Sequence, residues 1–209
     1  MHNKNILIIG ILAMLLLVNM VSASTWTESL NSGLMSYYKY DEGSTNGGTI
    51  LDSMNIANST NTDLTNVSGI LGSAYNFTLI TSKATRTVTD NVETLNLWIN
   101  WPADIGERGI ATDPDTNIPF HVHGGTTYAF WSGGYIDFNI APNYSAGWSM
   151  VTVVREGSGY RLFIDGINLT AVTVPYFKIS QIGTPGSANG GLMDEVGIWS
   201  RVLTQIEIS

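Results

Sequence analysis

The sequence predicts an all-β protein, a two-sheet antiparallel jelly-roll sandwich. Short segments rich in β-branched and aromatic residues alternate with turns rich in Gly, Asn, Asp and Ser. After the apolar leader, no window of useful length shows the apolar period of a helix. Many strands, frequent turns and no long helix are typical of a sandwich. No repeat of about 20–50 residues recurs, which argues against a solenoid.

Residues 1–23 read as a signal peptide and not as part of the fold. Lys4 precedes an apolar run at residues 6–18, and Val21-Ser22-Ala23 forms a small-residue cleavage site. An uncleaved anchor is the alternative. We therefore expect one β-sandwich domain over residues 24–209, which is secreted or held at the cell surface. We expect no membrane insertion after signal cleavage, because no second stretch is apolar enough to span a bilayer.

The composition limits the partners that this chain can have. There is no cysteine, so no disulfide framework stabilises an exported fold. The net charge is −8 with nine basic residues, which argues against nucleic acid or anionic lipid. Five N-x-Ser/Thr sequons are compatible with N-glycosylation, and they stand at Asn58, Asn66, Asn76, Asn143 and Asn168.

In the first half of the domain, two strands and two loops are expected. Residues 34–40 are aromatic-rich and read as a strand, whereas residues 55–72 read as surface loop around one weak strand. Residues 93–101 form the next strand, which Pro102 ends. The polar stretch at residues 103–119 is expected to be loop.

The second half of the domain gives clearer hairpin signals. Residues 126–142 hold two strands around Gly133-Gly134, and residues 148–155 pair with 160–165 across a Gly-containing turn. Near the end of the sequence, Thr204 and Glu207 fit a helix capping box. So short a helix needs to pack Leu203 and Ile206 on the sandwich, or else the sequence is cut from a longer protein.

Three blocks together resemble the laminin-G-like domains of the concanavalin A-like lectin/glucanase superfamily. The blocks are GLMSYYKYDEGS, AGWSMVTVVREGSGYRLFIDG and LMDEVGIWSRVLTQIEI, in that order along the chain. The resemblance implies a jelly-roll sandwich and an extracellular module that binds glycans or proteins and is sometimes attached to enzymes. The middle of the chain, residues 105–143, matches weakly, and that is where such domains usually differ in ligand.

Catalysis is not expected. Glucanases of this superfamily carry alternating carboxylates along one strand, in a Glu-x-Asp-x-x-Glu run, and this sequence has no such run. His121 and His123 lie on one face if their segment is a strand, a geometry that zinc sites use. A third ligand is lacking, since Asp113 or Asp115 is only a guess, and two exposed polar residues are the favoured interpretation.

Asp194 stands in an apolar strand, where alternation puts it on the face of Leu192, Val196 and Ile198. A buried carboxylate needs hydrogen bonds, a charge partner or a metal. In one alternative, Asp194 accepts hydrogen bonds from backbone amides of the opening strand or loop, which would fasten the end of the chain to its beginning. In the other, Asp194 joins Asp52 and Asn55 around a structural Ca²⁺, a cation that prefers oxygen ligands.

The weakly matched middle holds the candidate glycan site. Tyr128 and Phe130 alternate with Trp131, so Trp131 faces outward if the other two are core. Trp131 and Tyr135 are the stacking candidates for a sugar ring, and Asn139 and Asn143 are the polar candidates. Trp98, Trp148 and Trp199 are instead assigned to the core or its edge. We therefore predict a non-catalytic, glycan-binding module; the alternatives are an adhesive protein-interaction domain of a surface assembly and an accessory domain of a larger glycan-active protein.

Overall fold

The computed structural model describes residues 29–77, 79–101, 106–113, 115, 118–143, 147–183 and 191–209. The predicted signal peptide, residues 1–23, lies outside these described residues. Leu34–Ser209 form one compact unit, with residues 29–33 belonging to a separate unit. No helix in the described part of the chain combines the length and the apolar character needed to cross a bilayer.

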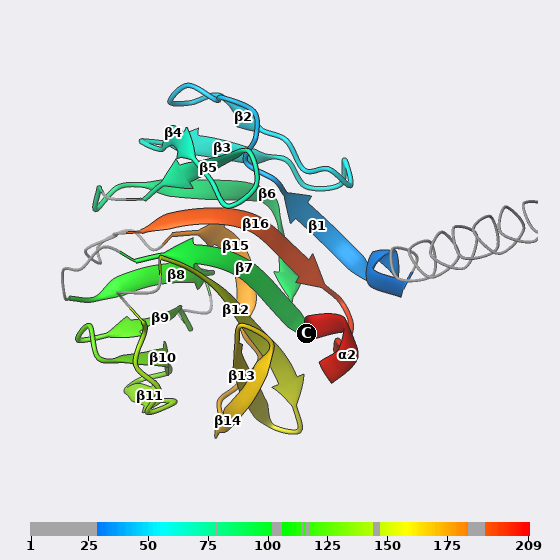
Figure 1. The fold of residues 1–209 in the computed structure, drawn as a ribbon, viewed down its shortest axis with the longest axis vertical. Helices are drawn as coiled ribbons and strands as arrows, with labels where there is room; N and C mark the ends of the chain where they lie inside the picture. The colour runs from blue at the N-terminus through cyan, green and yellow to red at the C-terminus, as the bar shows by residue number, and fades with distance from the viewer. Residues whose placement is uncertain are drawn as a thin grey trace, which may run out of the picture. The chain divides into compact units, whose positions relative to one another are not determined.

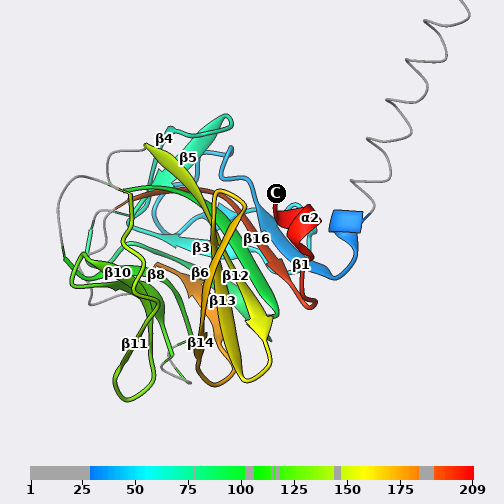
Figure 2. The ribbon, with the colours of Figure 1, turned by 60° about the horizontal axis from the view of Figure 1, so that its bottom comes forward.

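The compact unit consists of two antiparallel sheets, as the sequence predicts (Figures 1 and 2). Sheet A has the order β14 (Ile167–Thr173), β13 (Gly159–Ile164), β12 (Trp148–Glu156), β7 (Thr94–Asn100), β16 (Leu192–Trp199), β5 (Ser73–Asn76), β4 (Thr65–Ser68), with β1 (Leu34–Tyr38) also paired to β16. Sheet B has the order β11 (Tyr135–Asp137), β10 (Thr127–Trp131), β9 (Phe120–His123), β8 (Arg108–Thr112), β15 (Lys178–Ile182), β6 (Lys83–Asn91), β3 (Ser59–Thr62), β2 (Thr49–Ile50).

The last strand is central to sheet A. Along one edge of β16, the first residues pair with β5 and the later ones with β1, and its other edge pairs with β7. Tyr38 lies opposite Val196. The two ends of the domain are therefore hydrogen-bonded to each other (β1 blue and β16 orange-red in Figure 1).

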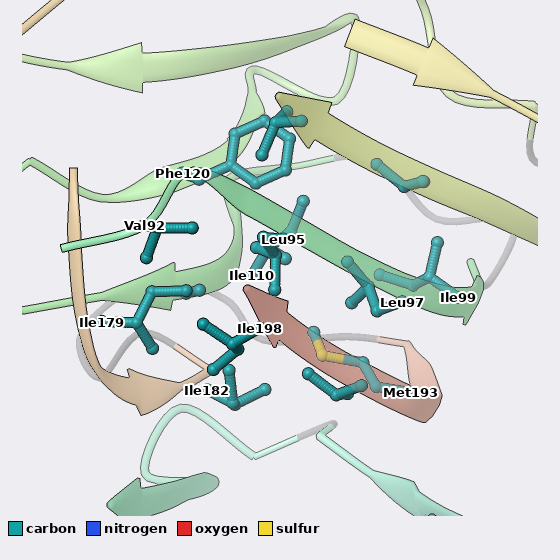
Figure 3. Close-up of a cluster of buried hydrophobic side chains, with 14 of the residues drawn as sticks. Val92, Leu95, Leu97, Ile99, Ile110, Phe120, Ile179, Ile182, Met193 and Ile198 are labelled. Atoms are coloured by element: carbon teal, nitrogen blue, oxygen red, sulfur yellow. The ribbon is translucent and has the colours of Figure 1, made fainter. Parts of the chain in front are cut away.

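The core lies between the sheets and is filled by aliphatic and aromatic side chains. Leu95, Leu97 and Ile99 of β7 face Ile179 and Ile182 of β15 in one cluster (Figure 3). Aromatic contacts also link the sheets, since the rings of Phe130 in β10 and Tyr160 in β13 lie 5.3 Å apart. Burial of this continuous apolar surface is the main stabilising term for a chain without disulfides.

Two expectations for the polar segments are wrong. Residues 55–72 hold two strands, β3 and β4, where one weak strand is predicted. Residues 103–119 include β8, which is predicted as loop. These strands have little apolar alternation of their own, and they form because neighbours supply the ladder: β8 lies between β9 and β15, and tertiary pairing overrides weak propensity.

The terminal helix α2 (Gln205–Ile208) forms at the predicted capping box. The Glu207 carboxylate accepts the backbone N–H of Thr204 at 2.8 Å. Leu203 is buried as expected, but Ile206 is 72% exposed and Ile208 is buried in its place. Two residues along a helix turn the side chain by about 200°, so only one of the two isoleucines can face the sheet.

Arg86 of β6 is buried between the sheets and ties sheet B to β1. Its Nε donates to the Tyr38 hydroxyl at 3.2 Å, and its Nη2 donates to the Ser36 hydroxyl at 2.9 Å. The guanidinium also donates to the carbonyl of Ile179 and to the Asp90 carboxylate, each at 2.7 Å. A planar fork with several donors is needed to reach all four oxygens at once.

Replacing this arginine is expected to destabilise the fold strongly. Arg86→Met should lower the free energy of unfolding by about 3 kcal/mol, because it leaves Asp90 and the two hydroxyls without their donor. Arg86→Lys should recover only part of the loss. Urea denaturation measures both, with Arg161→Met as the control: Arg161 pairs with Glu156 at the surface, which should cost less than about 1 kcal/mol. Equal losses for Arg86→Met and Arg161→Met would contradict the assignment.

Candidate functional site

Strands β9, β10 and β11 form one edge of sheet B, and their side chains alternate between the core and the outer face of the sheet. Phe120, Val122, Tyr128 and Phe130 point into the core and are buried. The alternation therefore turns Trp131 outward, which confirms the predicted orientation of all three residues in β10. The registers Trp131↔Tyr135 and Ala129↔His121 place β9 and β11 side chains on the same outer face.

Trp131 and Tyr135 form an aromatic pair on this outer face. Their ring centroids are 4.8 Å apart and the planes meet at 75°. The turn between them uses Gly133 at a φ of 73°, a backbone angle that favours glycine. Tyr135 is 44% exposed, whereas Trp131 is half-buried. Tyr135 is thus the more exposed ring of the pair, and Trp131 packs against it.

Two histidines support Tyr135 from β9. The His123 ring is parallel to the Tyr135 ring at a centroid distance of 3.4 Å, and its Nδ1 lies 2.9 Å from Asp137 Oδ1. The His121 ring meets Tyr135 edge-on at 5.5 Å. The predicted placement of both imidazoles on one strand face is confirmed, but the expectation that both are exposed is wrong for His121, which is buried.

Glu107, which precedes β8, completes the cluster. Its Oε1 accepts the Tyr135 hydroxyl and the Gly124 N–H, each at 3.1 Å. Its Oε2 lies 3.7 Å from His121 Nε2. We call Glu107, His121, His123, Trp131, Tyr135 and Asp137 the β9–β11 cluster.

His121 is the most constrained member of this cluster. It is only 5% exposed, and its Nε2 has no hydrogen-bond partner. Burial lowers the pKa of His121, and the Pro119 carbonyl and the Glu107 carboxylate oppose that effect. His121 is therefore neutral at pH 7. Burial, followed by the nearby Glu107, raises the pKa of Tyr135.

Asn139 and Asn143, the predicted polar partners, follow β11 and are both exposed. The polar groups in contact with Tyr135 come instead from the histidines and carboxylates of the β9–β11 cluster. Asp137 follows Tyr135 by two residues, so alternation alone could have placed it on the same face. Glu107 is distant in sequence and gives no local signal.

A zinc site is not assembled around the histidines. The guessed third ligands are elsewhere: Asp113 is buried and accepts the Ser180 hydroxyl at 3.1 Å and the Asp115 N–H at 3.3 Å. Among the described residues, no three His, Asp or Glu side chains are arranged to hold a metal ion.

Asp194 is fully buried, but the predicted face is wrong. The core cluster contains Met193, Val196 and Ile198, because a register shift after Asp194 inserts an extra residue into β16. Asp194 Oδ2 accepts the N–H groups of Ile70 and Leu71 at 2.9 and 3.2 Å, and Oδ1 accepts that of Glu195 at 2.9 Å.

These backbone bonds are of the kind that the hydrogen-bonded alternative predicts, but the donors lie in the β4–β5 turn and not in the opening strand or loop. Gly69 allows the approach, because a Cβ there would collide with the Asp194 carboxylate.

Asp52 forms a second, separate cap. Its Oδ1 accepts the N–H groups of Tyr37 and Met54 at 2.8 and 3.0 Å, and its Oδ2 accepts those of Ile56 and Ala57 at 3.2 and 2.9 Å. Asn55 is exposed beside it. Asp52 and Asp194 share none of these partners, and both carboxylates already face backbone donors. Calcium held jointly by Asp52, Asn55 and Asp194 stays a prediction.

The other predicted positions are placed as follows. Trp199 is buried, and Trp98 and Trp148 are half-buried, in sheet A. Among the sequons, the exposed asparagines are Asn66, Asn143 and Asn168, whereas Asn58 and Asn76 are half-buried.

Comparison with known proteins places the fold. The family model described as the concanavalin A-like lectin/glucanases superfamily matches residues 73–209. No curated protein matches the chain in sequence.

Several solved structures share the architecture at low sequence identity. Domain 4 of AbnA, a GH43 extracellular arabinanase from Geobacillus stearothermophilus solved with arabinotriose, has a TM-score of 0.61 and 17% identity, with 84% of this chain and 96% of that chain covered. The binding domain of Paraclostridial Mosquitocidal Protein 1 has a TM-score of 0.61 and 14% identity, with 86% and 51% covered. Trypanosoma rangeli sialidase in complex with sialic acid has a TM-score of 0.57 and 13% identity, with 85% and 32% covered. This chain therefore spans about half of the second protein and a third of the third.

The burial of Asp194 predicts a specific pH dependence of stability. Burial raises its pKa from 3.8 to about 6, with its backbone donors opposing the rise. Because the folded state holds the proton more tightly, the stabilisation from protonated Asp194 is complete below pH 4. It is lost as the pH rises through 6. The free energy of unfolding of the wild type minus that of Asp194→Asn should fall by roughly 3 kcal/mol between pH 4 and pH 7. A difference that stays constant across this range would contradict the assignment.

The same variant tests calcium. If Ca²⁺ binds at Asp194, millimolar calcium should raise the melting temperature of the wild type and leave that of Asp194→Asn unchanged. An equal response of both proteins would show that Asp194 is not a calcium ligand.

Proposed function

Because the chain belongs to the concanavalin A-like lectin/glucanases superfamily, we propose that it is a non-catalytic module that binds carbohydrate through the β9–β11 cluster. A sugar ring presents an apolar C–H face and a polar edge of hydroxyls. An exposed aromatic ring bordered by a few fixed polar groups suits both.

The observation that carries this proposal is the exposed Tyr135 ring, held between Trp131 and His123. The contacts at 4.8 Å and 3.4 Å fix its plane, and the bond to Glu107 fixes its hydroxyl. A ring that is ordered before binding loses little conformational entropy when it stacks on a ligand. The carboxylate of Asp137 and the imidazole of His123 lie next to this ring and carry groups to which a sugar hydroxyl can bond.

The neighbours in fold support the ligand class. The arabinanase domain was solved with arabinotriose and the sialidase with sialic acid, and a further neighbour is named as a binding domain. Their low identity leaves the sugar to be determined by this chain's own residues.

We place binding before catalysis because the carboxylates of the cluster have other partners. Glu107 accepts the Tyr135 hydroxyl and Gly124 N–H, and Asp137 pairs with His123. A retaining glycosidase needs one carboxylate free to attack and a second to protonate the leaving group.

We also propose a secreted or cell-surface location for this protein, because a glycan partner would be met there.

Removing either ring of the pair should abolish binding without unfolding the protein. Tyr135→Ala and Trp131→Ala should each weaken retention on a glycan array by at least tenfold, equivalent to about 1.4 kcal/mol. The matched controls are Tyr176→Ala and Trp148→Ala. Tyr176 is 45% exposed and donates its hydroxyl to Glu93 at 2.8 Å, much as Tyr135 does to Glu107, but it lies outside the cluster.

Other outcomes would favour the alternatives. Binding that survives both cluster variants, or is lost equally in the controls, would move the site elsewhere. A folded protein that retains no glycan but forms ordered oligomers or captures a surface protein would favour the adhesive role. Hydrolysis of a bound glycan that Glu107→Gln eliminates would establish an enzyme.

A further inference from the structure

The two histidines of the β9–β11 cluster are the only histidines among the described residues. Both lie against Tyr135, and each faces a carboxylate: His121 faces Glu107 at 3.7 Å, and His123 faces Asp137 at 2.9 Å. Histidine is the side chain whose ordinary pKa lies closest to neutrality. Protonation of an imidazole here would therefore change the charge beside Tyr135.

At neutral pH the cluster is negative. Among the described residues, the charged and titratable groups facing His121 are Glu107, His123, Tyr135 and Asp137, which come from three different segments. With both imidazoles neutral, the two carboxylates give the described part of the cluster a formal charge of −2. A carboxylated or sulfated sugar stacked on Tyr135 would lie next to these charges and be repelled.

His121 also has an unused donor position. Its Nδ1 is near the Pro119 carbonyl at 3.3 Å, and its Nε2 has no hydrogen-bond partner although the side chain is buried. When the ring is protonated, both nitrogens carry a proton. Nε2–H then becomes a charged donor 3.7 Å from Glu107 Oε2.

We propose that the charge of His121 controls which sugars this site accepts: anionic glycans are excluded while His121 is neutral and are admitted when the pH falls far enough to protonate it. This inference rests on the proposed glycan-binding function. Protonation of His121 makes the formal charge of the cluster one unit less negative. Neutral sugars bind with little dependence on this change.

The sign follows from linkage. A bound anion stabilises a nearby imidazolium, so the histidine pKa is higher in the complex than in the free protein, and binding takes up protons. Affinity for the anion must then rise as the pH falls through the histidine pKa. Each imidazole whose pKa rises by one unit on binding contributes up to about tenfold.

The experiment compares matched sugars on one array at pH 7.5, 6.5 and 5.5. The array carries neutral oligosaccharides, each beside its sialylated and its sulfated form. Sialic acid and sulfate esters keep their charge over this range, so the protein is the part that titrates. The measured quantity is the affinity for the anionic form divided by that for its neutral parent, and we expect it to rise about tenfold from pH 7.5 to 5.5.

Variants separate the histidines from other titrating groups. His121→Asn should lose this pH dependence, and because the measured quantity is a ratio, any loss of affinity common to the neutral and anionic sugars cancels. Glu107→Gln should raise the ratio already at pH 7.5, a gain that misfolding cannot produce. Asp194→Asn is the control, because Asp194 also titrates near pH 6 but lies in sheet A; it should leave the ratio unchanged.

A ratio that does not change with pH, with neutral glycans still bound through the aromatic pair, would overturn this inference and leave the proposed function intact. A pH dependence that persists in His121→Asn would also overturn it. Failure to retain any glycan at all three pH values would overturn the proposed function, and this inference with it.

Discussion

The inward aromatic rings of the β9–β11 edge are the constraint on which the exposed surface depends. Phe130 lies 5.0 Å from Phe120 and 5.9 Å from Phe138, and it reaches Tyr160 of sheet A at 5.3 Å. These four rings fix the register of three short strands. Because a slip of one residue would exchange the two faces, the packing of the core determines that Tyr135, Trp131 and both histidines face outward together.

How far sequence reasoning reaches depends on whether a position is set by alternation or by tertiary contact. Trp131 and the two histidines follow from alternation once Phe130 and Phe120 are core, so their face is predictable. Glu107 reaches Tyr135 only because β8 pairs with β9, and β8 has no strand signal of its own. The polar partners expected at Asn139 and Asn143 stay a prediction, because both residues follow the end of β11, where strand alternation no longer sets the face of a side chain.

The last strand illustrates a limit of a period-two pattern. β16 changes its partner from β5 to β1 near its middle, and there the ladder is interrupted and Glu195 adopts a φ of 51°. The extra residue turns Asp194 away from the core face that the pattern assigns to it. The acidic pair Asp194-Glu195 lies beside donors that are not bonded within a strand ladder. Asp194 accepts the N–H groups of the β4–β5 turn, and Glu195 accepts the Tyr37 hydroxyl. A prediction that assumes unbroken alternation along β16 therefore assigns Asp194 to the wrong face.

The carboxylates of this protein divide by the kind of donor that they face. Asp52 and Asp194 accept backbone N–H groups, which do not titrate and cannot move without disrupting the chain. Glu107 and Asp137 face a phenol and imidazoles, whose protons and positions can change. Without disulfides, the fold needs carboxylates of the first kind to close its turns. Carboxylates of the second kind add little to the fold because their partners are partly exposed, so they remain available to exchange a side-chain donor for a ligand hydroxyl. The β9–β11 edge therefore has the chemistry of a recognition surface, and the neighbourhood of Asp52 and Asp194 has that of a structural closure.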